Sequence, residues 1–156
     1  MRRPASEIDS ARARHLAITW LARREYGSRE LHQKLLHKGC AEPVAAQTVE
    51  RLKTQQLLSD ERFVESLIAA RRRRGYGPVR IAHELREKGI APEAIEDSLG
   101  KDDAGWLEEA RRVHRKKFGA ARPKSYAERA KRARFLQYRG FTPDQIRRIL
   151  DSREAD

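Results

Sequence analysis

The fold is decided by residues 76–95, which read YGPVRIAHELREKGIAPEAI. An aromatic residue and Gly77 open the stretch, and a second glycine, Gly89, follows after a short run of helix-compatible residues. Glycine is common where a helix ends, and proline is tolerated in the first helical turn. We therefore predict one helix from Pro78 to just before Gly89 and a second helix that begins at Pro92.

The same pattern occurs three times along the chain. Each copy has an aromatic-glycine pair, a leucine and a later glycine, in the order Tyr26-Gly27, Leu35 and Gly39, then Tyr76-Gly77, Leu85 and Gly89, then Phe118-Gly119, Leu136 and Gly140. Apolar residues at helical spacing precede each pair and indicate one more amphipathic helix. The longer separation of Gly119 and Gly140 indicates an insertion near residues 120–128.

These repeats predict an all-α protein. We expect three tandem three-helix repeats that form an elongated, curved array. The predicted repeats cover residues 11–58, 59–101 and 102–152. No alternating pattern typical of β-strands interrupts them.

Several helix ends have recognisable capping residues. Gly27 is predicted to end the first helix as a C′ glycine, and Ser28 to cap the second helix. Ser59 is predicted to cap the first helix of the second repeat. Ser125 and Glu128 fit a capping box at the start of a helix in the third repeat.

Cys40 is the only cysteine among the 156 residues, so a disulfide within the chain is excluded. It follows Gly39 at a position that is apolar in the other repeats, which predicts a buried thiol and not a nucleophile. Residues 1–10 contain no apolar stretch, and no segment approaches the roughly 18 apolar residues of a membrane span. We expect a cytoplasmic protein that is neither exported nor inserted into a membrane.

The charge of the chain favours a polyanionic partner. Lysine and arginine number 35 against 23 acidic residues, which gives a net charge of +12. Residues 111–139 contain 12 basic residues and one acidic residue, Glu128. Such a stretch suits nucleic acid or an acidic protein surface, and charge alone does not choose between them.

Motifs for catalysis are missing from the sequence. It contains no phosphate-binding GxxxxGK[ST] loop, no HExxH and no GxSxG. The closest histidines, His32 and His37, are not aligned on one helix face. We therefore expect no enzymatic activity, no metal site and no cofactor.

Basic clusters end two equivalent helices and are the candidate binding residues. Arg71–Arg74 close one helix, where positive charge also compensates the helix dipole, so both a structural and a binding role stay open. The predicted partner-binding and nucleic-acid-binding residues are Arg71, Arg72, Arg73, Arg74, Arg80, Arg111, Arg112, Arg115, Lys116, Lys117, Lys131, Arg132 and Arg134. Nearby aromatic residues are suited to stack on bases, although core packing is favoured for them: Tyr76, Phe118 and Tyr138.

Two long segments of the chain resemble a known family. The first comprises SDERFVES at residues 59–66, RRRRGYGP at 71–78 and IAHELREKGI at 81–90, and the second is RFLQYRGFTPDQI at 134–146. Both are similar to segments of the RecX family of bacterial regulatory proteins, and the likeness extends over nearly the whole chain.

The resemblance implies a fold of three tandem three-helix repeats. It also implies a modulator that binds the RecA recombinase and its DNA filament. Members of the family typically inhibit strand exchange, ATP hydrolysis and coprotease activity, in DNA repair and the SOS response. We expect weak contact with single- or double-stranded DNA, without sequence specificity, and a monomer.

Two alternatives stay open at this point. A three-helix unit can present a recognition helix to the major groove, which would make the chain a transcriptional regulator. A structural nucleoid protein would compact DNA without regard to a recombinase. Salt-resistant binding to one short duplex would favour the regulator, whereas steeply salt-dependent DNA binding with tight recombinase binding would favour the modulator.

Overall fold

The computed structural model describes residues 8–100 and 102–151. Lys101 and Ser152, the last residues of the predicted second and third repeats, lie outside these ranges, as do residues 1–7 of the amino-terminal segment. All regular elements among the described residues are α-helices, which confirms the predicted fold class. They are α1 (Ser10–Leu21), α2 (Ser28–His37), α3 (Glu42–Thr54), α4 (Asp60–Arg73), α5 (Pro78–Glu87), α6 (Pro92–Leu99), α7 (Asp103–Phe118), α8 (Tyr126–Arg139) and α9 (Pro143–Asp151).

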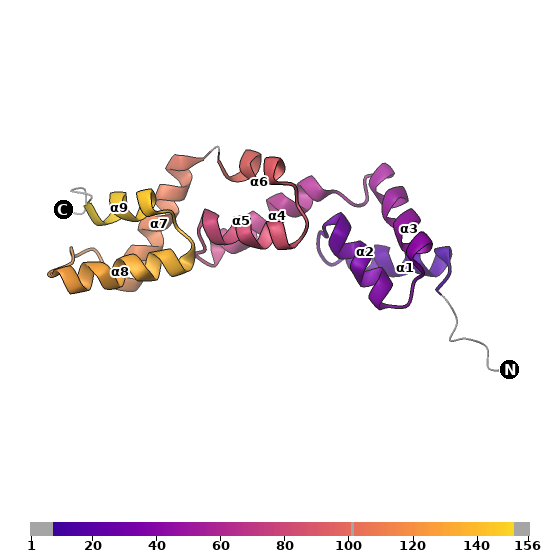
Figure 1. Ribbon diagram of the computed structural model, residues 1–156, viewed down its shortest axis with the longest axis horizontal. Helices are drawn as coiled ribbons and strands as arrows, with labels where there is room; N and C mark the ends of the chain where they lie inside the picture. The colour runs from indigo at the N-terminus through magenta and orange to yellow at the C-terminus, as the bar shows by residue number, and fades with distance from the viewer. Residues whose placement is uncertain (1–7, 101, 152–156) are drawn as a thin grey trace. The chain divides into compact units, whose positions relative to one another are not determined.

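The helices form two compact units. The first holds α1, α2 and α3 with the start of α4 and residues 88–90, and the second holds the rest of α4 with α5 to α9. Within the first unit α1, α2 and α3 contact one another, and within the second α7, α8 and α9 do so (Figure 1). α5 contacts α6 in the second unit.

Small and aliphatic side chains form the core of the first unit. Ala13 and Ala17 lie one turn apart on α1, and Leu31 and Leu35 lie one turn apart on α2. All four side chains are fully buried, because i, i+4 spacing places them on one face of each helix. Burial of a leucine contributes about 1.5 to 3 kcal/mol, so these helices are held mainly by packing.

Cys40 belongs to the same core. Its side chain is buried, as the sequence predicted. Burial raises the pKa of the thiol, which keeps it protonated near neutral pH and makes it a poor nucleophile.

The start of α2 differs from the prediction in both of its capping residues. α1 ends at Leu21, and Gly27 precedes α2 as its N-cap with a φ of −75°, so it is not a C′ glycine. Ser28 is the first residue of α2 and does not cap it. Its backbone N–H donates to Asp60 Oδ1 and its hydroxyl donates to Asp60 Oδ2, each at 2.7 Å. Glycine has no side-chain acceptor, and the carboxylate of Asp60 supplies one instead.

Two other helix starts follow the sequence. Ser59 Oγ accepts a hydrogen bond from the backbone N–H of Arg62 at 3.2 Å, and Ser125 Oγ accepts one from Glu128 at 3.1 Å. The predicted caps of α4 and α8 are therefore confirmed. Local capping of this kind is readable from sequence because donor and acceptor are three residues apart.

The second unit is built around α7. Trp106, Ala110 and Val113 lie on one face of this helix and are buried. Val113 and Ala110 join the core that contains Leu136 of α8 and Phe141. This packing fixes the carboxyl-terminal half of α7 against α8, where the candidate binding residues lie.

Gly77 and Gly140 allow two backbones to touch in the second unit. The N–H of Gly77 donates to the carbonyl of Arg139 at 2.8 Å, and the N–H of Val79 donates to the carbonyl of Gly140 at 2.8 Å. A Cβ on Gly77 would lie 2.5 Å from the Gly140 carbonyl oxygen. Gly140 itself has a φ of +97°, a conformation that favours glycine after a helix.

Candidate nucleic-acid interface

Basic side chains from three helices surround one hollow in the second unit. The end of α4, the carboxyl-terminal half of α7 and the end of α8 form its walls, and its volume is about 240 Å³. None of the described residues that line it is acidic. Its cations, which stand around Gly75, Val113 and Phe135, are Arg73, Arg74, Arg112, Lys116, Lys117 and Arg139. We call this site the basic hollow.

Arg139 connects α8 to the end of α4. Its Nη1 donates a hydrogen bond of 2.9 Å to the carbonyl oxygen of Arg74. The guanidinium carbon lies 5.5 Å from the ring centre of Tyr76 and 5.3 Å from that of Phe135. A cation over aromatic faces and at a helix carboxyl end is favourably placed.

Arg112 connects α7 to the same helix end. Its Nη2 donates to the carbonyl oxygen of Arg72 at 3.1 Å and to the Glu109 carboxylate at 2.8 Å. Arg112 therefore contributes a partly neutralised charge to the hollow. Arg73, Arg74, Lys116 and Lys117 are exposed, so these four cations are accessible to an incoming phosphate.

Phe135 gives the hollow an aromatic surface. Lys117 Nζ lies 5.6 Å from its ring centre, and Phe118 meets the ring edge-on at 5.3 Å. Cationic groups around an aromatic ring are typical of surfaces that bind nucleic acid. The shape and charge of the basic hollow suit a phosphate group better than a neutral ligand.

The four consecutive arginines have different environments. Arg71 forms a double hydrogen bond with Glu84 of α5, at 2.8 and 2.6 Å, and these bonds hold the pKa of Arg71 above its usual value. Arg72 lies 4.4 Å from the ring centre of Trp106 and 3.5 Å from Asp102. Arg71 and Arg72 therefore hold helices of the second unit together. Arg73 and Arg74 instead line the basic hollow.

Arg80 is stacked between two tyrosines. Its guanidinium carbon lies 3.9 Å from the ring centre of Tyr76 and 5.4 Å from that of Tyr138. The Tyr138 side chain is 75% exposed, so the core packing favoured by the sequence is wrong for this residue. Phe118 packs against Phe135, in keeping with that expectation.

Four more of the predicted binding residues lie on α7 and α8 outside the basic hollow. Arg111 pairs with Glu108 at 3.5 Å. The other three are exposed and add positive charge to the two helices: Arg115, Lys131 and Arg134.

Arg132 requires a correction, because it is only 3% exposed. Its Nη1 donates to the Ala121 carbonyl at 2.7 Å and its Nη2 pairs with Glu128 at 2.5 Å. The guanidinium also faces His114 Nε2 at 3.3 Å. A cation enclosed in this way holds the 119–125 loop onto α8, so we no longer assign Arg132 to the binding surface.

His114 is affected by this enclosed cation. Burial lowers the pKa of His114, and the positive charges of Arg132 and Arg115 lower it further. Neutral imidazole can accept a hydrogen bond from Arg132, whereas imidazolium would repel it. The contact therefore depends on pH.

Arg139 is not among the binding residues predicted from the sequence, although it lies in the basic stretch 111–139. Only the hydrogen bond to Arg74 shows that it lines the basic hollow.

Residues 8–100 and 102–151 offer neither a clustered metal site nor a membrane-spanning helix. These residues contain no group of three or more His, Cys, Asp or Glu side chains arranged to hold a metal ion. None of their helices has both the length and the apolar character needed to cross a membrane.

Three family models match successive parts of the chain. They describe the first three-helix domain of RecX at residues 13–52, the second at 59–99 and the third at 107–150. The chain belongs to the RecX family. The predicted arrangement of three three-helix repeats and the predicted family are therefore both confirmed.

Relatives with the name regulatory protein RecX align along most of their length. The protein of Pseudomonas putida is 41% identical over 143 residues, which are 92% of each chain. That of Halorhodospira halophila is 41% identical over 147 residues, which are 94% of this chain and 91% of the relative. Membership in RecX thus places this chain in a family of regulatory proteins.

Solved structures support the fold. A crystal structure of RecX from Lactobacillus salivarius superposes with a TM-score of 0.80 at 21% sequence identity, covering 95% of this chain and 98% of that one. A second RecX crystal structure gives a TM-score of 0.73, also at 21% identity, and covers 92% of this chain and 74% of that one.

Proposed function

We propose that this RecX protein binds a RecA recombinase and its DNA filament and inhibits strand exchange, ATP hydrolysis and coprotease activity in DNA repair and the SOS response. Family membership supports a regulatory role, and the basic hollow is the observation that carries the proposal. Six cations and no acidic lining residue make a site for a phosphodiester backbone or an acidic protein surface.

The contact with DNA is weak and independent of sequence. The basic hollow is formed by helix ends that carry long arginine and lysine side chains, which suit phosphate groups. Contacts to phosphates position a protein without reading bases. With up to six phosphates neutralised, the logarithm of the affinity falls with the logarithm of salt with a slope of roughly −4 to −5.

The protein acts as a monomer without a cofactor and catalyses no reaction itself. Its cations compete for the DNA backbone or for acidic recombinase residues along the filament. A bound molecule then blocks the addition of recombinase subunits or favours their release. One bound molecule stops growth at a whole filament end. Inhibition therefore occurs when the concentration of this protein is well below that of the recombinase.

A titration of the cognate recombinase tests this function. DNA-stimulated ATP hydrolysis on single-stranded DNA is measured while this protein is added at ratios far below one per recombinase monomer. A fall in the rate at such ratios supports the proposal. An unchanged rate up to equal concentrations contradicts it, and salt-resistant binding to one short duplex would then indicate a transcriptional regulator.

A further inference from the structure

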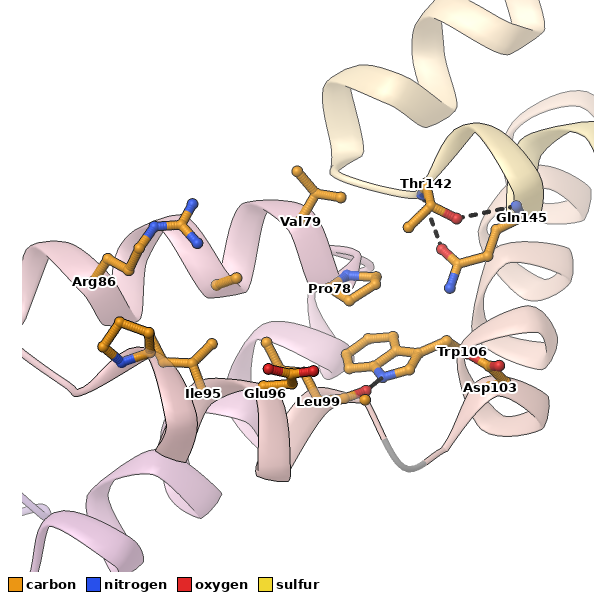
Figure 2. A pocket seen from close by; sticks show the side chains of 13 residues that line it. Pro78, Val79, Arg86, Ile95, Glu96, Leu99, Asp103, Trp106, Thr142 and Gln145 are labelled. Atoms are coloured by element: carbon orange, nitrogen blue, oxygen red, sulfur yellow. Dashed lines mark hydrogen bonds between the residues drawn. The ribbon is translucent and has the colours of Figure 1, made fainter.

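A second hollow in the second unit is apolar (Figure 2). It has a volume of about 530 Å³ and is bordered by α5, α6 and the first turns of α7 and α9. Ile95, Leu99 and Trp106 are buried residues that line it. Ala82 and Val79 of α5 line it as well, and Val79 is 51% exposed. We call this site the apolar groove.

Three polar side chains at the groove already form hydrogen bonds within the protein. Trp106 Nε1 donates to the carbonyl of Leu99 at 3.1 Å, and Thr142 and Gln145 each accept a hydrogen bond from the other's backbone N–H, at 3.1 and 2.9 Å (Figure 2). The groove therefore offers an arriving group mainly apolar surface. Its volume falls within the range of about 300 to 1,000 Å³ that is common for ligand sites.

Charged residues of both signs stand around the groove. Figure 2 shows Arg86 toward the left, Asp103 beside Trp106 at the right, and Glu96 between them. Arg86, Glu96 and Asp103 are exposed. Within the described part of the chain no ion pair or hydrogen bond engages their charged groups. A protein segment that carries charges of both signs could therefore form ion pairs with one cation and two carboxylates at the groove.

The corresponding surface of the first repeat carries polar side chains. In the register set by Gly39 and Gly89, Ala82 corresponds to His32 and Pro92 to Glu42. His32 Nε2 and the Glu42 carboxylate meet at 2.9 Å and bridge that surface. The second repeat has small apolar residues at both positions, which leaves the surface open.

We infer that the apolar groove docks a segment of the recombinase in which an apolar side chain lies between an acidic and a basic residue. The apolar side chain packs on Trp106 and Leu99, the acidic residue pairs with Arg86, and the basic residue pairs with Asp103 or Glu96. This inference rests on the proposed function, and it assigns the contact between this chain and the recombinase to the apolar groove.

Nucleic acid does not fit this site. Glu96 and Asp103 would repel phosphates, and the basic hollow already provides a cationic surface at the other end of α7. Trp106 and Lys116 are separated by ten residues of α7, or about 15 Å along the helix axis. The second unit therefore carries one face for protein and another for a polyanion.

Two binding assays on the full chain separate these faces. Affinity for the cognate recombinase is measured without DNA, and affinity for a short single-stranded oligonucleotide is measured without recombinase. The groove variants are Val79→Asp and Arg86→Glu, both at exposed positions. Ile18→Asp on α1 is the matched control, because Ile18 is an apolar residue that is 39% exposed and lies far from the groove in sequence. Helical circular dichroism and thermal unfolding verify the fold of each variant.

Val79→Asp is expected to weaken recombinase binding by about tenfold or more and to leave DNA affinity within about twofold, while Ile18→Asp changes neither. Equal recombinase affinity for wild type and folded Val79→Asp would overturn the groove assignment alone. Equal loss of DNA affinity in that variant would overturn it too, because the groove would then contact nucleic acid. A wild-type chain that fails to bind the recombinase would overturn the proposed function together with this inference.

Val79 also permits a test that does not depend on lost affinity. A photoreactive Val79→benzoylphenylalanine variant is expected to crosslink to a recombinase peptide with an apolar residue between opposite charges. The absence of that crosslink under conditions where wild type binds would contradict the inference.

Discussion

The guanidinium of Arg139 donates a 2.9 Å hydrogen bond to the backbone carbonyl of Arg74 and so joins the ends of α8 and α4. This bond brings a cation from near the carboxyl terminus beside the run of arginines that closes α4. The basic hollow exists because the two helix ends meet there.

Arg139→Ala is expected to lower the free energy of unfolding by about 1 to 2 kcal/mol, because it removes this hydrogen bond and the contacts with Tyr76 and Phe135. It is also expected to weaken binding to single-stranded DNA. Chemical denaturation and fluorescence anisotropy measure the two effects. Arg139→Lys is the control: it keeps the charge and should retain most of the DNA affinity. Equal DNA affinity for Arg139→Ala and wild type would contradict a role in the basic hollow.

Gly77→Ala is expected to destabilise the protein by about 3 kcal/mol or more, because its Cβ would lie 2.5 Å from the Gly140 carbonyl oxygen, on rigid backbone. Gly119→Ala is the matched control. Gly119 has a φ of +80° and a ψ of −173°, a conformation that is almost exclusive to glycine, but no atom lies within 4 Å of an added Cβ, so this change measures backbone strain alone, of about 1 to 3 kcal/mol. Thermal unfolding distinguishes the two, and similar losses for both would show that the close approach is not limiting.

His114 predicts a pH dependence of stability. Its pKa in the folded state is lowered from 6.5, so the unfolded chain binds a proton more readily than the folded chain. The stability that neutral His114 provides is complete above pH 6.5 and is lost as the pH falls from 6.5 through the lowered pKa of the folded state. His114→Gln should reduce the loss of stability between pH 7.5 and about 5.5 in urea denaturation. His15→Gln, at an exposed position on α1, serves as the control, and an unchanged pH profile in His114→Gln would count against the contact with Arg132.

Salt dependence tests the basic hollow as a phosphate site. The double variant Arg73→Glu/Lys116→Glu is expected to reduce the steepness of the log affinity against log salt plot for single-stranded DNA by roughly 1 to 2 units. Arg23→Glu/Lys38→Glu changes the net charge equally at exposed positions of the first unit and should alter the slope far less. Identical slopes for the two variants would mean that overall charge, and not the hollow, controls DNA binding.

Local signals account for most of the fold. Prolines and glycines mark the starts of α5 and α6, and serine caps α4 and α8, because these interactions join residues only a few positions apart. The cap of α2 could not be predicted in this way. Asp60 lies 32 residues beyond Ser28, and no local pattern links them.

The candidate site was predictable as a charge pattern but not as a geometry. The sequence cannot distinguish Arg71, which is held by Glu84, from Arg73, which is exposed. The sequence does not show that Arg132 is buried either. Its guanidinium donates to the carbonyl of Ala121, in the loop that precedes α8, and this contact is visible only in the structure. The direction of each side chain depends on tertiary contacts between helices.

Inhibition of the recombinase through the basic hollow is tested most directly by ATP hydrolysis of the cognate recombinase on preformed single-stranded DNA filaments. Wild type, Arg73→Glu/Lys116→Glu and Arg23→Glu/Lys38→Glu are each added far below the recombinase concentration. We expect wild type and Arg23→Glu/Lys38→Glu to lower the rate, whereas Arg73→Glu/Lys116→Glu requires about tenfold more protein or does not lower it. Equal inhibition by all three proteins, or none by wild type, would contradict this expectation.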